Sequence, residues 1–254
     1  MRVDLDGKVA VVTGGIRNIG RAISLDLARS GATVAVTYAT DEQSAKETIS
    51  DIERLGGKAA AYQVDVREIL DLQARFAEIA RDLGLISILV NNAAVRPAAK
   101  IGDIQVGDFD EVVSVNLRGP LCAAQAVLPG MRSAGWGRIV NISGTSAYIG
   151  GVQRAHVVAT KLGIVGLSRA LALECAGWGV TVNTVVPGWI GNGKDSAAHD
   201  VVLDRIPLDR RGIPDDVSAA VTYLCSPDAG YMTGQELLVN GGLWPLARQP
   251  WNEY

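Results

Sequence analysis

The chain has 254 residues, 48% of them hydrophobic, and carries a formal net charge of −3 with a pI near 5.5. A chain of this length and composition can bury one large core, and α/β folds of this size often form a single domain. The acidic balance gives no basic footprint, so neither a nucleic acid nor an anionic membrane is an expected partner.

Short apolar runs alternate along the chain with longer segments of helical periodicity, which is typical of a parallel sheet covered by helices on both faces. Seven strands are predicted, at residues 9–13, 33–37, 59–64, 86–91, 138–142, 180–185 and 236–240. Six helices are predicted, at residues 19–30, 42–55, 68–83, 106–131, 157–177 and 214–226. With right-handed crossovers, this order predicts an α/β fold: one Rossmann-type domain over residues 1–254, built on a doubly wound parallel sheet.

One long segment, roughly Gly188 to Gly212, has few strand or helix signals and contains a polar run from Gly191 to Asp200. Irregular segments of this length inside a compact domain are usually lids or disordered. We therefore predict a lid-like loop at about 188–212 that faces a substrate or a partner.

Three widely spaced cysteines, Cys122, Cys175 and Cys225, form no C-x-x-C pattern, so no metal site is predicted from them. Such thiols are typical of buried side chains in a reducing compartment. The chain has no run of about 18 uninterrupted apolar residues, and its first residues lack the apolar run of a signal peptide. These features predict a cytoplasmic protein without a membrane segment.

A glycine-rich turn, TGGIRNIG, follows the first predicted strand and contains Gly14, Gly15 and Gly20. Glycines at such a turn let the backbone approach a pyrophosphate, and the start of the next helix supplies free N–H groups and a positive dipole. The alternative is a purely structural turn, because strand-to-helix turns also use glycine for steric reasons. The position after the first strand favours nucleotide binding.

Several short motifs, in their order and spacing, resemble the short-chain dehydrogenase/reductase family from about Gly7 to Gly242. They are TGGIRNIG, the VDV around Asp65, NNAA, VNLRG, GRIVNIS, ATKLGIVGL, PGWI and YMTGQELLVNGG. The resemblance implies a bound nicotinamide cofactor, with Asp65 near its adenine. The positions it assigns to the cofactor are Gly14, Arg17, Asn18, Ile19, Gly20, Asp65, Val66, Asn91, Ala93, Lys161, Pro187, Gly188 and Ile190.

The cofactor expected from this pattern is NADP(H). The second strand ends at Thr37 and Tyr38 with no acid to bind a ribose 2′-hydroxyl, whereas Arg17 lies within the glycine turn. Asp41 is more naturally the cap of the next helix and does not argue for NAD. The alternative is that Arg17 is only a solvated loop charge.

Two positions near the expected cofactor depart from the family pattern. Asn18 stands where family members usually have glycine, and asparagine is the non-glycine residue most tolerant of positive φ. The turn can therefore survive, while the Asn18 side chain can weaken or abolish cofactor binding. Asn192 stands in place of a threonine beside the nicotinamide and can still form hydrogen bonds.

The catalytic positions depart further. In the family, a serine after the fifth strand and a tyrosine four residues before the lysine polarise and protonate the carbonyl. Counting back from Lys161 puts the tyrosine position at Val157, and the usual serine-to-tyrosine spacing then falls on Gly144. Ser143 is one residue early, and a one-residue slip in the loop would restore it as a substitute. No slip restores the tyrosine, because Val157 and Lys161 share one helical segment.

Tyr148 is the other possible substitute, since it lies in the loop that the family uses to shape the substrate pocket; as a pocket wall it needs no catalytic role. His156 points about 100° away from the helix face of Lys161, so a solvated or interface histidine is the favoured interpretation. His199 carries no spacing signal.

Asn116 and Lys161 are the retained catalytic positions, which in the family bridge a water and hold the ribose. Their structural alternatives are that Asn116 stabilises a bent helix and that Lys161 pairs with a neighbouring acid.

Three functions remain open. The favoured one is a non-catalytic subunit that supports an NAD(P)-dependent alcohol or hydroxyacyl dehydrogenase in a mixed tetramer with a catalytically intact sister chain. The second is an atypical NADP(H)-dependent carbonyl reductase or alcohol dehydrogenase with a replacement proton donor, and the third is a non-redox lyase or isomerase. The expected assembly is a homotetramer or a hetero-tetramer. The substrate would be an alcohol, a ketone or an acyl thioester, in a pocket expected at Arg96, Tyr148, Arg154, Trp189 and Lys194.

Overall fold

Seven parallel strands form one sheet in the order β3-β2-β1-β4-β5-β6-β7, in a computed structural model that describes residues 3–191 and 203–246. This arrangement confirms the predicted single-domain, doubly wound fold, and the strand ends differ from the predicted ones by at most two residues. The strands are β1 (Val9–Val12), β2 (Thr33–Tyr38), β3 (Lys58–Gln63), β4 (Ile86–Asn91), β5 (Gly137–Ile142), β6 (Val180–Pro187) and β7 (Glu236–Val239).

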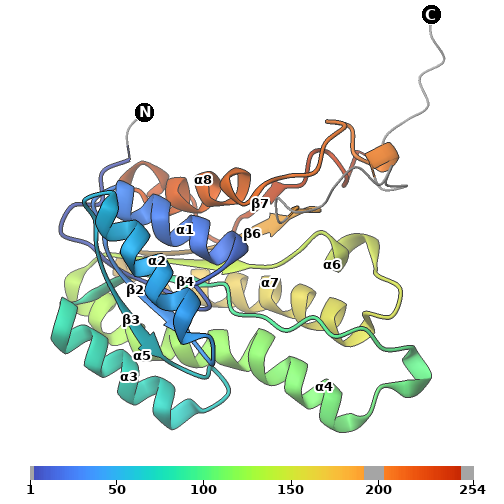
Figure 1. Cartoon of the computed structure of the whole chain (residues 1–254), viewed down its shortest axis with the longest axis horizontal. Helices are drawn as coiled ribbons and strands as arrows, with labels where there is room; N and C mark the ends of the chain where they lie inside the picture. Colours follow the sequence, from blue (N-terminus) through green and yellow to red (C-terminus); the bar gives the residue numbers. More distant parts are fainter. Residues whose placement is uncertain (1–2, 192–202, 247–254) are drawn as a thin grey trace, which may run out of the picture.

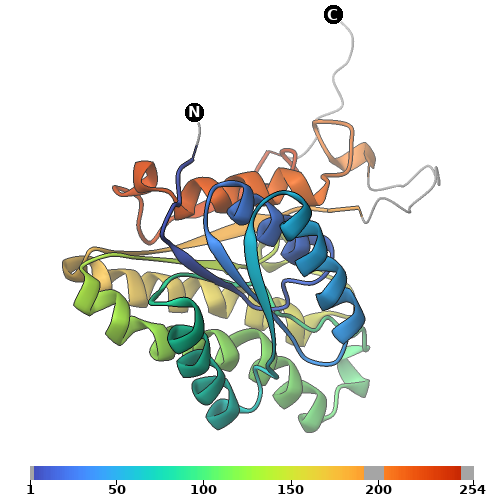
Figure 2. The ribbon, with the colours of Figure 1, turned by 60° about the vertical axis from the view of Figure 1, so that its left-hand side comes forward.

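Helices cover both faces of the sheet, and each face has its own apolar core (Figures 1 and 2). On one face lie α1 (Asn18–Arg29), α2 (Glu42–Arg54) and α8 (Pro214–Cys225). On the other lie α3 (Ile69–Leu83), α5 (Gly119–Ala134) and α7 (Ala155–Cys175). The strand order reverses direction between β1 and β4, so a ligand crevice is expected beyond the carboxyl ends of these strands.

The segment predicted as one helix over 106–131 is helical throughout, but it is not one regular α-helix. It consists of α4 (Val106–Val113), a π-helical turn (Ser114–Arg118) and then α5. Pro120 lies at the start of α5, where it lacks an N–H donor and its ring would clash with the carbonyl of Asn116 in a regular α-helix. The resulting π turn bends the helix at Asn116.

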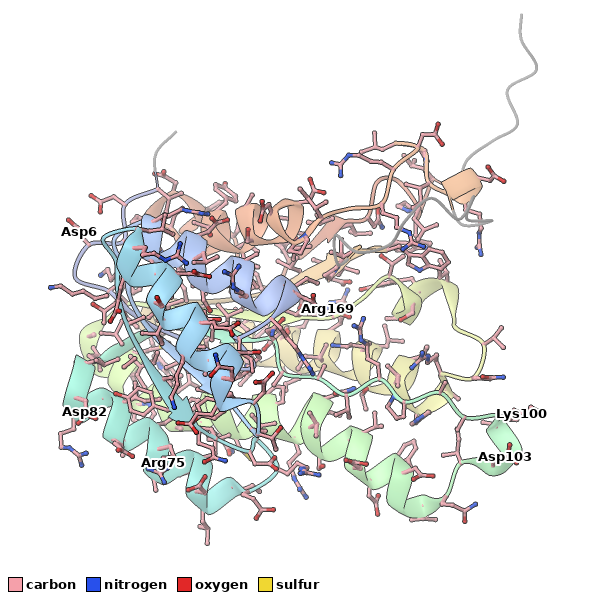
Figure 3. The ribbon with its side chains drawn as sticks, viewed as in Figure 1. Asp6, Arg75, Asp82, Lys100, Asp103 and Arg169 are labelled. Atoms are coloured by element: carbon pink, nitrogen blue, oxygen red, sulfur yellow. The ribbon has the colours of Figure 1, made fainter. Side chains whose placement is uncertain are left out.

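Two further differences lie near the carboxyl ends of the strands. The short helix α6 (Ser146–Ile149) was not predicted. The segment at 188–212 is partly ordered, because Ile190 forms a parallel β-bridge with Gly212 and residues Leu203–Arg205 make a 3₁₀ turn. Most of the polar run from Gly191 to Asp200 lies outside the described residues, so the lid stays a prediction. The segment between β4 and α4 also extends away from the sheet, with Lys100 and Asp103 at its tip (Figure 3).

The segment Ala155–Trp178 is long and apolar enough to cross a membrane by length and composition, with a hydropathy of 1.3. Half of it is buried inside the fold, because α7 packs on the sheet beside β6. We therefore assign it as a core helix. Cys122, Cys175 and Cys225 are buried free thiols, as predicted.

A buried polar network joins the strands β4, β5 and β6 to α7. The side-chain amide of Asn91 donates to Asn141 Oδ1 at 2.8 Å, and the amide of Asn141 donates to Ser168 Oγ at 2.8 Å. Thr184 Oγ1 donates to the same Ser168 oxygen at 2.9 Å. Ser168 Oγ in turn donates to the carbonyl oxygen of Ile164 at 2.7 Å. One hydroxyl therefore fixes how α7 sits on β5 and β6.

Replacing that hydroxyl tests this role. Ser168→Ala leaves the amide of Asn141 and the hydroxyl of Thr184 without their buried acceptor, so we expect a loss of about 2–3 kcal/mol in the free energy of unfolding. Urea unfolding followed by circular dichroism measures it. The control is Ser50→Ala on the exposed side of α2, where a change within about 0.5 kcal/mol is expected. Equal changes in both variants would show that the network does not fix α7.

Candidate functional site

The turn between β1 and α1 has the shape of a phosphate cradle. Gly14 has a φ of +61° and Asn18 a φ of +46°, so asparagine adopts the left-handed conformation predicted for it. A Cβ at Gly20 would collide with the Gly14 carbonyl and the Asn92 amide, which explains glycine there. Arg17, the N-cap of α1, makes no side-chain capping hydrogen bond. The first N–H groups of α1 are therefore open to an anion.

The start of the segment after β4 holds this turn in place. Thr13 Oγ1 accepts hydrogen bonds from the backbone N–H groups of Asn92, at 3.0 Å, and Ala93, at 3.1 Å. The side-chain amide of Asn92 donates to the carbonyl oxygens of Thr13 and Gly14, each at 3.0 Å. Polar contacts from β4 thus fix the glycine turn in the crevice where the strand order reverses.

Beyond the end of β2, Asp41 is a helix cap, as expected, and Arg17 lies nearby in the glycine turn. Asp41 caps α2, since its carboxylate accepts from the Ser44 N–H at 3.0 Å and from Ser44 Oγ at 2.7 Å. These hydrogen bonds, with a smaller contribution from Arg17, lower the pKa of Asp41. The side chain of Arg17 is solvent-exposed and makes no hydrogen bond or ion pair to a described residue. Its guanidinium is available to a ligand phosphate.

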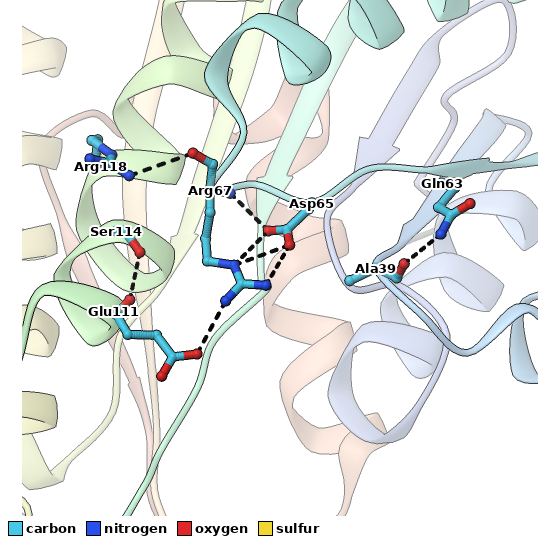
Figure 4. A network of polar contacts seen from close by, with 7 residues as sticks. All are labelled: Ala39, Gln63, Asp65, Arg67, Glu111, Ser114 and Arg118. Atoms are coloured by element: carbon cyan, nitrogen blue, oxygen red, sulfur yellow. Dashed lines mark hydrogen bonds and ion pairs between the residues drawn. The ribbon is translucent and has the colours of Figure 1, made fainter. Parts of the chain in front are cut away.

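Asp65, which the resemblance places near the adenine, is held in a fork by Arg67 (Figure 4). Arg67 Nη2 lies 2.7 Å from Asp65 Oδ2, and this contact lowers the pKa of Asp65. Arg67 Nη1 reaches Glu111 Oε1 on α4 at 3.2 Å, and Arg118 Nη2 contacts the Arg67 carbonyl at 3.5 Å. The network anchors the segment after β3, including the buried Val66, to the α4–α5 unit.

Lys161 is buried in α7 with only 7% of its surface exposed. Its Nζ donates to the carbonyl oxygen of Ile142, at the end of β5, at 2.8 Å. Burial, with a smaller contribution from the charge of Arg96, lowers the pKa of Lys161 to about 8. The alternative that Lys161 pairs with an acid was wrong within the described chain, where it has no carboxylate partner.

The hydroxyl groups on either side of Gly144 are both committed to backbone carbonyls. Ser143 Oγ donates to the Lys161 carbonyl at 2.6 Å, and Thr145 Oγ1 donates to the Pro187 carbonyl at 3.0 Å. Val157 is 3% exposed and apolar. A Cβ at Gly144 would have only Ser146 Oγ nearby, at 3.8 Å, so the position has room for a side chain.

Asn116 joins the π turn to two neighbouring segments. Its Oδ1 accepts from the Val95 N–H at 2.9 Å, and its side-chain amide donates to the Val95 carbonyl at 3.0 Å and to Thr160 Oγ1 at 3.2 Å. These contacts fit the structural alternative for Asn116, because they hold the bent helix against α7 and the segment after β4.

The hydroxyl of the half-buried Tyr148 and the ring nitrogens of the buried His156 have no hydrogen-bond partners among the described residues. The ring of Tyr148 stacks on Trp244, with ring centroids 4.4 Å apart, while its hydroxyl has no partner. His156 is 1% exposed and both of its ring nitrogens lack partners, so the prediction of a solvated histidine was wrong. The contact of Trp244 with Tyr148 was not predicted from the sequence.

A cavity of about 240 Å³ opens beside the end of β6. Arg96 and Trp189 line it, as expected, while Tyr148 and Arg154 are not among its lining residues. Arg211 also lines it and was not predicted; the bridge between Ile190 and Gly212 brings it there. Three further candidates lie outside the described residues: Asn192, Lys194 and His199.

Known proteins resemble the chain over almost its full length. A family model described as enoyl-(acyl carrier protein) reductase matches residues 14–244. Nodulation protein G of Azospirillum brasilense is 37% identical over 240 residues, which are 93% of this chain and 98% of that protein. The 3-oxoacyl-(acyl-carrier-protein) reductase FabG of Staphylococcus aureus is 36% identical over 241 residues, again 93% and 98% of the two chains.

Solved structures agree with these sequence matches. A structure assigned as a short-chain alcohol dehydrogenase of Sinorhizobium meliloti has a TM-score of 0.90 at 35% identity, covering 96% of this chain and 98% of that one. One assigned as an NAD(P)-dependent gluconate 5-dehydrogenase of Beutenbergia cavernae, with NADP bound at low occupancy, has a TM-score of 0.88 at 35% identity. It covers 96% of this chain and 99% of that one.

The burial of Lys161 predicts a variant that is more stable than the wild type. Lowering the pKa of Lys161 from 10.5 to about 8 corresponds to a penalty of about 3 kcal/mol at pH 7. Lys161→Met removes the penalty and loses one hydrogen bond worth about 1 kcal/mol, so we expect it to raise the free energy of unfolding by about 2 kcal/mol.

The pH dependence checks the cause. Below pH 8, Lys161 is charged in both the folded and the unfolded state, so the penalty is complete. Between pH 8 and 10.5, the folded wild type has lost the proton that the unfolded chain keeps, so the wild type becomes more stable as pH rises and the advantage of Lys161→Met shrinks. Urea unfolding from pH 7 to 10 measures this. An advantage that stays constant over that range would contradict the lowered pKa.

Proposed function

The chain belongs to the short-chain dehydrogenase/reductase family, and we propose that it binds NADP(H) and acts as the non-catalytic subunit of a mixed oligomer. The observation that carries the proposal is that the two positions near Lys161 where the family has hydroxyl side chains carry none in this chain. At the two positions where the family has serine and tyrosine, this chain has Gly144 and the buried Val157, and the neighbouring hydroxyls of Ser143 and Thr145 are bound to carbonyls.

The residues of the crevice fit a nicotinamide cofactor. The glycine turn has the left-handed residues and the uncapped helix start that a pyrophosphate requires, and Ala93 packs on Gly14 beside them. Arg17 would meet a 2′-phosphate and Lys161 would hold the ribose. When bound, the nicotinamide supplies a hydride. Gly144 and Val157 would supply no general acid, and such a group typically contributes about 10²–10⁴-fold to the rate.

Exposed apolar residues on α7 support assembly into an oligomer. The outer face of α7 exposes Leu162 and Leu173, at 49% and 86%, with the small residues Gly166 and Ala170 exposed between them. This spacing puts an apolar row on one side of the helix. In the family, helices at this place join subunits, so the row would meet either a second copy or an intact sister chain in a cytoplasmic tetramer.

A second candidate function is an atypical NADP(H)-dependent carbonyl reductase. The buried hydroxyl of Tyr148 favours it, because that group has no partner among the described residues and can donate a proton to a bound ligand. No contact in the described structure favours a lyase or isomerase.

Restoring the missing side chains tests the main proposal. Gly144→Ser/Val157→Tyr puts both hydroxyls at the family positions, and the space around Gly144 accepts a side chain. With acetoacetyl-coenzyme A and ethyl acetoacetate, we expect the wild type to oxidise NADPH at the background rate and the double variant to be at least about 10²-fold faster. Gly144→Ser/Val157→Phe is the matched control, since it adds the ring without the hydroxyl.

Turnover by the wild type at the rate of the double variant would overturn the non-catalytic proposal. The Tyr148→Phe variant then decides whether the second candidate is correct. A fall in kcat of about 10²-fold or more, with cofactor affinity unchanged, would identify Tyr148 as the donor.

The cofactor preference gives a separate prediction. Arg17→Met removes the guanidinium expected at the 2′-phosphate, so we expect the Kd for NADPH to rise about 10-fold or more while the Kd for NADH stays the same. Cofactor fluorescence titrations measure both constants. Arg29→Met, at the far end of α1, is the control. An equal loss of affinity for both cofactors would mean that Arg17 does not bind the 2′-phosphate.

A further inference from the structure

The cavity beside β6 is basic, although the chain as a whole has a net charge of −3. Its lining combines two arginines, Arg96 and Arg211, with the indole of Trp189 and the backbone around Ile190. No acidic side chain is among the described residues that line it. The cavity therefore presents positive charge beside an aromatic surface.

Arg96 is the charge most available to a ligand. It follows β4 by a few residues, is solvent-exposed, and makes no hydrogen bond or ion pair with a described residue. Its charge also acts on Lys161, because Arg96 contributes to the lowered pKa of that group. Two cations thus stand within electrostatic reach of each other at one end of the sheet, without a carboxylate between them in the described chain.

An anion bound at this place would relieve that repulsion. Guanidinium groups bind carboxylates through two parallel hydrogen bonds, and such charge-assisted pairs are about twice as strong as neutral ones. A cavity of about 240 Å³ lies below the usual range of about 300–1,000 Å³ for drug-sized ligands, so it suits a small molecule. The aromatic face of Trp189, which is 42% exposed, can cover an apolar part of that molecule.

We propose that this cavity binds a small oxo acid or hydroxy acid, with its carboxylate on Arg96 and its apolar part on Trp189. The inference rests on the proposed function in one respect, namely that the nicotinamide would lie beside this cavity. It holds for either candidate function, because it concerns binding and not turnover.

The phosphates of the cofactor are a second possible source of the anion. They would be bound at the glycine turn, where the N–H groups of α1 are open, whereas Arg96 lies on the segment after β4. An experiment that follows the acid and NADPH separately distinguishes the two sources.

Calorimetric titration of the full-length protein with pyruvate and phenylpyruvate, each beside its methyl ester, tests the proposal. We expect the acids to bind at least about 10-fold more tightly than the esters, and this preference to fall as salt is added. Arg96→Met should abolish the preference and Arg96→Lys should keep part of it. Arg81→Met, an exposed arginine on α3, is the matched control and should change nothing.

The proposal would be overturned by equal affinities for acids and esters, by no binding of either acid at millimolar concentration, or by an unchanged preference in Arg96→Met. A loss of NADPH affinity in Arg96→Met with acid binding intact would assign Arg96 to the cofactor and also overturn it. Titrations with NADPH alone test the proposed cofactor site separately from the proposed acid site. Acid binding through Arg96 in a protein that does not bind NADPH would sustain this inference and refute the proposed cofactor site.

Discussion

The fold buries the ammonium group of Lys161 without giving it a carboxylate partner in the described chain. What holds the group is a pair of contacts between α7 and the end of β5: Nζ donates to the Ile142 carbonyl, and the Lys161 carbonyl accepts from Ser143. The hydroxyl of Ser168, two turns along the helix, extends the same attachment to β6. These hydrogen bonds hold the Lys161 ammonium group in place, although its burial is energetically unfavourable.

Under the proposed function, the site around Lys161 would bind charged ligands without transferring a proton. The glycine turn and Arg17 offer donors for phosphates, and Arg96 offers a donor for a carboxylate. The hydroxyls of Ser143 and Thr145 are bound to backbone oxygens, and Val157 is apolar. Hydride transfer to a carbonyl needs a proton for the oxygen as well, so the proposed function separates cofactor binding from turnover.

Local chemistry explains which features were predictable from the sequence. The alternation of apolar runs and helical segments was enough for the sheet, and the cap at Asp41 and the positive φ of Asn18 depend only on near neighbours. Pro120 is a local signal for the π turn, although the spacing of apolar residues alone predicts one regular helix. The burial of His156, the stack of Trp244 on Tyr148 and the place of Arg211 arise from contacts between distant segments, which spacing along the chain does not encode.

The most direct test of this account is a titration of the purified wild-type protein with NADPH, followed by cofactor fluorescence in the presence of acetoacetyl-coenzyme A. The account predicts saturable binding at micromolar NADPH, with the bound cofactor remaining reduced. The absence of binding at millimolar NADPH would contradict the cofactor site. Repeated oxidation of the cofactor by the isolated chain would contradict the missing proton donor.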